Sequence, residues 1–136
     1  MMYMDDLATE IRERQARQHL EDDLQATVVQ FLRWALPVDA LHWHVPNGGK
    51  RHRKEAARMV KLGVRAGIPD IHVAYQGRLY CVEMKPPGKA PQLNDAQKQV
   101  IPRLRGCGVP VAVCQSLHEV TLALLDWGIP LQAKPA

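Results

Sequence analysis

Apolar residues recur every three or four positions near the start of the chain, from Leu24 through Val28 to Leu32. This is the spacing of an amphipathic helix, so we expect helix over residues 5–36, with polar turns at its start. A proline follows directly and ends the helix. The next stretch, HWHVPNGGKRH (42–52), combines Pro, Asn and Gly in the manner of a loop.

A short basic segment with helical periodicity follows the loop, from about residue 53 to residue 62. Its apolar residues recur on one side, and we expect them to face inward; they are Ala56, Ala57, Met59 and Val60. Gly63 then ends this helix.

Two apolar runs, residues 71–75 and 78–85, flank the dipeptide Gln76-Gly77. A two-residue connection containing Gly is typical of a β-hairpin. A third apolar run, residues 109–114, has the composition of a buried strand. These runs predict a hairpin and one further strand.

Two more helices are predicted, one before and one after the third strand. Asn94 caps the first, which runs towards residue 105 with Pro102 expected to kink or shorten it. Ser116 opens the second. The resulting order, α, α, β, β, α, β, α, predicts an α/β fold: one mixed central β-sheet flanked by helices in a single domain.

The charge of the chain is unevenly distributed. Its net charge is +4 and its pI about 9.2, which favours a polyanionic partner. Between residues 50 and 65 a single acid, Glu55, stands among seven cations: Lys50, Arg51, Arg53, Lys54, Arg58, Lys61 and Arg65. This segment either contacts phosphates or forms a solvated face, and the scarcity of acids favours phosphate contact.

Cysteine usage and hydropathy exclude several classes of protein. The three cysteines show no CxxC spacing, so neither a disulfide framework nor a cysteine-rich zinc site is expected. Apolar stretches are too short to span a bilayer, and the acidic start MMYMDDLATE does not have the composition of a signal peptide. We therefore expect a cytoplasmic protein.

The residues that point to chemistry lie on the predicted hairpin. Asp70 opens its first strand, and Glu83 and Lys85 close the second, so the hairpin brings two carboxylates and an ammonium to one end of a sheet. Paired carboxylates with the Met84 carbonyl would suit Mg²⁺ or Mn²⁺, and Lys85 would hold the attacking water or balance phosphate charge. The alternative is an ordinary surface pair of Glu83 and Lys85.

Four segments of the chain resemble the VRR-NUC branch of the PD-(D/E)xK nuclease superfamily. They are HVPNGGKR (44–51), EAARMVKLGVRAGIPDI (55–71), YCVEMK (80–85) and Q-K-x-x-x-P-x-L-x-x-x-G-V-P-V-A-V (97–113). The resemblance implies a restriction-endonuclease-like core over residues 19–130, preceded by a helical extension (1–18) and followed by a tail (131–136). It also implies a divalent ion held by Asp70, Glu83 and the Met84 carbonyl.

The resemblance adds further candidate residues. Glu21, with Gln25 one turn later, matches an acid of the first helix, although acids there could simply favour a helix N-terminus. Gln97 matches a helix glutamine that could touch the water or a phosphate, or merely complete a capping box with Asn94. His44 and Asn47 match positions that contact DNA.

His42 and His44 could also be read as metal ligands, but no further Cys or His falls at zinc spacing, so packing or backbone hydrogen bonding is the expected role of each. Trp34, Trp43 and Trp127 are expected in the core, with stacking on an unpaired base as the alternative for Trp43.

Three functions remain after these observations. The leading one is a metal-dependent DNA endonuclease, since stand-alone VRR-NUC proteins of phages and bacteria resemble homodimeric enzymes that act on branched DNA such as Holliday junctions. A nuclease-like module that binds DNA without cutting it is the second. An HNH enzyme ranks last, because His52 follows Asn47 too closely. On this basis the expected partners are branched DNA and a second copy of the chain, in a bacterial cell or phage-infected host.

Overall fold

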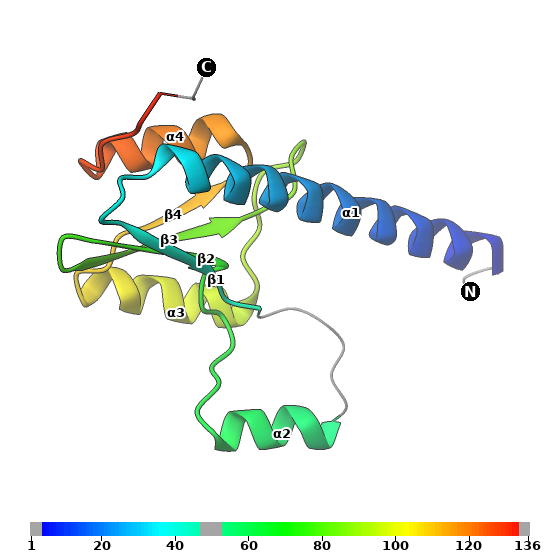
Figure 1. The fold of residues 1–136 in the computed structure, drawn as a ribbon. Coiled ribbons are helices and arrows are strands. Elements are labelled where there is room, and N and C mark those ends of the chain that lie inside the picture. The colour runs from blue at the N-terminus through cyan, green and yellow to red at the C-terminus, as the bar shows by residue number, and fades with distance from the viewer. Residues whose placement is uncertain (1–3, 47–52, 134–136) are drawn as a thin grey trace. The chain divides into compact units, whose positions relative to one another are not determined.

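The computed structural model describes residues 4–46 and 53–133 (Figure 1). In chain order the elements are α1 (Met4–Ala35), β1 (Leu41–His44), α2 (Arg53–Lys61), β2 (Ile71–Tyr75), β3 (Arg78–Met84), α3 (Asp95–Gly106), β4 (Val111–Cys114) and α4 (Leu117–Asp126). All four predicted helices are present, as are the three predicted strands.

The strands form one four-stranded sheet in the order β1-β2-β3-β4. β2 pairs antiparallel with both β1 and β3. β4 runs parallel to β3, because the Cys81 N–H donates to the Pro110 carbonyl and the Lys85 N–H to the Cys114 carbonyl. The mixed sheet predicted from the sequence is therefore confirmed, with α3 in the connection between its parallel strands.

Strand β1 is the element that the sequence did not predict. The loop expected from residue 42 begins only after His44, since Leu41–His44 pairs with Ala74–Ile71 of β2. Four residues followed by turn-forming ones give little local signal, and pairing with a distant strand decides their conformation. The core position expected for Trp43 is also wrong: this edge-strand side chain is 39% exposed.

By the contacts within it, the chain divides into two compact units. The first comprises the described parts of Met1–Val38, Met84–Pro91 and Val113–Ala136. Its core joins one end of α1 to α4 and the segment after it; the buried residues are Val28, Leu32, Ala35, Leu36, Met84, Cys114, Val120, Leu124 and Ile129. Trp34 and Trp127 of this unit are half-buried. No helix in the described ranges is long and apolar enough to cross a membrane.

The second unit comprises Asp39–Glu83 and Gln92–Ala112. Its apolar core is formed by β2, β3 and α3 with the start of β4, and contains Ile71, Val73, Tyr80, Cys81, Val82, Val100, Ile101 and Val111. The predicted hairpin turn is confirmed, with φ of 48° at Gln76 and 75° at Gly77. Pro102 does not shorten α3, which continues to Gly106.

Helix α2 has the predicted position but not the predicted burial. None of its residues is buried; Ala56, Ala57 and Val60 are exposed and Met59 is half-buried. The expectation that these side chains face a core is therefore wrong. Periodicity shows which side of a helix is apolar, but whether another element covers that side depends on tertiary packing.

Candidate active site

Asp70 and Glu83 are brought together by the β2–β3 hairpin. Asp70 lies directly before β2, and the register that pairs Ile71 with Val82 places it opposite Glu83. The Asp70 backbone N–H donates to Glu83 Oε2 at 3.2 Å. Glu83 is only 3% exposed, whereas Asp70 is half-buried. The predicted convergence of the two carboxylate residues is thus present within one unit of the chain.

Gln97 connects this pair to α3. Its side-chain Nε2 donates to Glu83 Oε1 at 2.8 Å. Its Oε1 accepts from the Asn94 N–H at 3.0 Å, while the Gln97 N–H donates to Asn94 Oδ1 at 2.9 Å, which completes a capping box. The two interpretations of Gln97 are therefore compatible: one side chain caps the helix and holds a carboxylate of the site.

His44 holds the main chain at Asp70. Its Nδ1 lies 2.8 Å from the Asp70 carbonyl oxygen, which also accepts from the Val45 N–H at 2.7 Å. Because a carbonyl can only accept, Nδ1 carries the proton. Backbone hydrogen bonding is one of the roles that the sequence predicts for His44, beside contact with DNA, and this bond confirms it. The partner could not be predicted, because the residues of strand β1 were expected to form a loop from residue 42.

Gly67 fixes the loop that leads to Asp70. Its φ is +87°, and a Cβ placed there would lie 2.6 Å from the carbonyl carbon and oxygen of Ala96. The loop therefore packs directly on the first turn of α3, the helix that carries Gln97. The sequence contained the signal in its G-V-R-A-G-I-P-D run, but only the structure shows what approaches the glycine.

His72 lies on β2, two residues beyond Asp70. Burial lowers its pKa, and a hydrogen bond to the Pro69 backbone partly opposes this effect. Its Nε2 is buried and has no hydrogen-bond partner among the described residues, and its ring packs edge-on against Trp43 with centroids 5.6 Å apart. These contacts favour a neutral imidazole that fills space beside the site.

The remaining residues predicted for the reaction belong to the first unit. Met84 is fully buried and ends β3. Lys85 follows, half-buried, and its N–H donates to the Cys114 carbonyl at 2.9 Å. Glu21 and Gln25 lie on α1, and both are half-buried. Within the second unit, Glu83 is in contact with both Asp70 and Gln97, and His44 is in contact with Asp70.

The donor set fits a hard cation with few protein ligands. In residues 4–46 and 53–133, no group of three His, Cys, Asp or Glu side chains could hold a metal ion. A cation at Asp70 and Glu83 would therefore complete its shell with main-chain oxygens and water. Mg²⁺ is commonly bound in this way, through one or two carboxylates with several retained waters.

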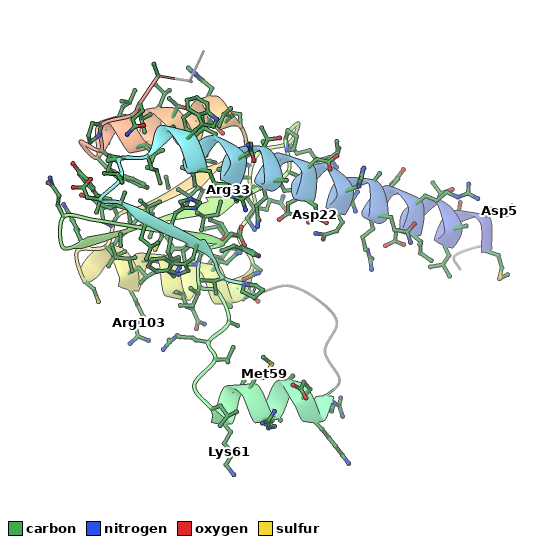
Figure 2. All side chains as sticks on the ribbon, viewed as in Figure 1. Asp5, Asp22, Arg33, Met59, Lys61 and Arg103 are labelled. Atoms are coloured by element: carbon green, nitrogen blue, oxygen red, sulfur yellow. The ribbon has the colours of Figure 1, made fainter. Side chains whose placement is uncertain are left out.

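The other residues predicted to contact DNA fall into two groups. Arg53, Lys54, Lys61 and Arg65 are exposed, whereas Asn47, Lys50 and Arg51 lie outside the described residues. On α2, Lys54, Arg58 and Lys61 have i, i+4, i+7 spacing and so share one side of the helix. Figure 2 shows Lys61 and Met59 on opposite sides of α2. One side of this helix is therefore cationic and the other apolar.

The similarity of this chain to known proteins points to one family. The family model of the VRR-NUC domain matches residues 9–118. A solved structure described as a VRR_NUC domain protein is similar to this chain with a TM-score of 0.57 and 22% sequence identity, over 79% of this chain and 86% of the other. No curated protein matches.

Proposed function

This chain belongs to the VRR-NUC domain family, and we propose that it is a divalent-metal-dependent endonuclease that hydrolyses phosphodiester bonds in DNA. The fold of the family is a nuclease fold of the restriction-endonuclease-like type. The observation that carries the proposal is the Asp70–Glu83 pair, which Gln97 and His44 hold from two sides.

Asp70 and Glu83, with the Met84 carbonyl, are the proposed ligands of Mg²⁺ or Mn²⁺. When bound, such an ion supplies Lewis acidity at the scissile phosphate and lowers the pKa of water. Carboxylates repel one another at close range, so a cation between them also removes a cost of bringing them together.

The other residues orient the reactants. Lys85 follows Glu83 by two positions, and along a strand that spacing gives both side chains the same side of the backbone. Its ammonium would hold the attacking water and balance charge on the phosphate. The water oxygen forms the new P–O bond and gives up one proton to solvent, one ester P–O bond breaks, and the departing oxygen takes up a proton from solvent. Glu21 remains a proposed further acid of the site.

The proposed substrate is branched DNA, cut by a homodimer as in a Holliday-junction resolvase. The exposed cations of α2 support contact with a polyanion, since none of them forms an ion pair with a described residue. Two copies of one site would allow symmetric cuts in opposing strands of a junction, because a twofold dimer presents identical surfaces on both sides.

The test is cleavage of end-labelled four-way junction, flap, duplex and single-stranded DNA in Mg²⁺, Mn²⁺ or EDTA. We expect metal-dependent cutting that Asp70→Ala and Lys85→Ala abolish. Asp39→Asn, which removes an exposed carboxylate elsewhere in the same unit, is the matched control and should cut normally. Binding without cutting in every metal would instead identify a nuclease-like module that only binds DNA.

A further inference from the structure

A hollow of about 170 Å³ opens on one side of α3, within the second unit. Helix α3 and its C-cap residue contribute side chains at i, i+3, i+4 and i+7 spacing, and the loop before Asp70 forms the other wall. The lining residues are Arg65, Ile68, Val100, Arg103, Leu104 and Cys107. Neither the proposed cation site nor the cationic side of α2 uses this hollow.

The size and lining of the hollow suit one flat ring. An apolar protein cavity of about 150 Å³ accommodates benzene. Here Ile68, Val100 and Leu104 supply apolar surface, and the two guanidinium groups can stack on a π face. A nucleobase has these properties, and stacking of this kind tolerates any base because each has a π face.

The charge at the hollow favours a nucleotide over an apolar protein side chain. Arg65 and Arg103 are both exposed, and Figure 2 shows Arg103 projecting from α3. No acid lines the hollow, and neither arginine has an ion pair with a described residue. An apolar ring that carries a phosphate would satisfy both the apolar wall and the two cations.

The hollow shares helix α3 with Gln97, the residue that donates to Glu83. Gln97 and Arg103 are six residues apart on α3, or about 9 Å along the helix axis. The contact of Gly67 with Ala96 fixes the opposite wall against the same helix. Along one strand of duplex DNA, about 9 Å corresponds to two or three nucleotides.

We propose that this hollow receives the base of an unpaired nucleotide two or three positions from the scissile phosphate, with its phosphate between Arg65 and Arg103. The proposal rests on the proposed nuclease function and gives it a source of structure selectivity. A base inside a regular duplex is stacked and cannot enter, whereas a base at a branch point has lost its partner and enters at little cost.

The test uses a substitution at a lining residue that fills the hollow with a side chain of the protein itself. Cys107→Trp places a large ring in it, and Lys98→Trp places the same ring at an exposed position of α3 outside it. Single-turnover cleavage is measured on branched DNA that carries one abasic nucleotide at each position from one to four nucleotides on either side of the cut. Thermal unfolding checks that each variant is folded.

We expect an abasic nucleotide at the second or third position to slow the wild-type chain about tenfold, as loss of one stacked base does. Cys107→Trp should slow cleavage of intact DNA by a similar factor. Its cleavage rate on the abasic DNA should be no lower than its rate on intact DNA. Lys98→Trp should behave as wild type. Equal cleavage rates for Cys107→Trp and Lys98→Trp would overturn the proposal. So would a Cys107→Trp chain whose rate falls a further tenfold when the DNA carries the abasic nucleotide.

Two further measurements keep the result decisive. If Cys107→Trp does not fold, alkylation fills the hollow instead; Cys107 is exposed, while burial raises the pKa of Cys81 and Cys114 to about 11 and protects them. If the wild-type chain cuts no DNA, the nuclease proposal fails on its own. The anisotropy of fluorescent branched DNA, measured without metal, then tests whether the hollow binds a base. Filling the hollow must weaken the binding of intact DNA and leave the binding of abasic DNA unchanged.

Discussion

Gln97 donates its side-chain amide to Glu83 across 2.8 Å, while the oxygen of the same amide accepts from the Asn94 backbone N–H. One side chain therefore performs two tasks that can be separated by chemistry. The helix cap requires an acceptor at this position, and the contact with Glu83 requires a donor. A carboxylate can perform the first task and not the second.

Gln97→Glu separates the two tasks. The cap survives, but a second carboxylate then faces Glu83, and like charges in a buried site raise the pKa of one of them. We expect the metal concentration for half-maximal cleavage to rise about tenfold and the pH–rate profile to move to higher pH.

Asn94→Ala is the matched control, because it removes the cap and leaves the Gln97 donor in place. It should lower the free energy of unfolding by about 1 kcal/mol and leave the pH–rate profile where it was. Equal pH profiles for wild type and Gln97→Glu would show that Gln97 acts on helix stability alone.

Gly67→Ala should destabilise the chain by about 2–4 kcal/mol, from backbone strain at positive φ together with overpacking. The new Cβ would lie 2.6 Å from the Ala96 main chain, which cannot move without shifting the start of α3. Gly63→Ala is the control: its φ is +100° but nothing lies within 4 Å, so it should cost about 1 kcal/mol. Urea unfolding measures both, and equal losses would contradict the close approach.

His72 should make stability depend on pH in the mildly acidic range. Its pKa is lowered in the folded chain from about 6.5, so below that pH the unfolded chain binds more protons. The free energy of unfolding should fall as the pH drops from 6.5 towards the folded pKa, by at most about 1.4 kcal/mol per pH unit. His72→Phe should flatten this part of the profile, whereas the exposed His118→Gln should not. Parallel profiles of unfolding free energy against pH for all three proteins would contradict a lowered pKa at His72.

The cationic side of α2 should determine the salt dependence of DNA binding. Each phosphate contact contributes about 0.9 to the slope of log K against log salt. Neutralising Lys54, Arg58 and Lys61 together should therefore reduce the slope by about 3 and weaken binding to every DNA alike. Neutralising the exposed Arg12 and Arg17 of α1 should leave the slope unchanged. An unchanged slope for the α2 variant would exclude this helix from the interface.

Much of the site could be predicted because its geometry follows from local rules. A two-residue turn at Gln76-Gly77 sets the register of the hairpin, and that register alone places Asp70 opposite Glu83. The capping box of Asn94 and Gln97 likewise depends only on residues within four consecutive positions.

What could not be predicted depends on partners distant in the chain. Backbone hydrogen bonding is expected of His44, but nothing near it in the sequence indicates that its partner is the Asp70 carbonyl, because that contact requires β1 to pair with β2. The donor bond from Gln97 to Glu83 joins residues of two different elements. The exposure of Val60 shows the same limit, since an apolar stripe does not specify what covers it.

We propose that Asp70 and Glu83 bind the divalent cation that supports DNA cleavage. The most direct test is Mn²⁺ binding by calorimetry beside the rate of junction cleavage across the same Mn²⁺ concentrations. For the wild-type chain, binding and rate should reach half-saturation together, and the near-isosteric Asp70→Asn and Glu83→Gln should lose both. Cleavage that persists in EDTA, or Mn²⁺ binding that is equally tight in the two amide variants, would contradict the claim.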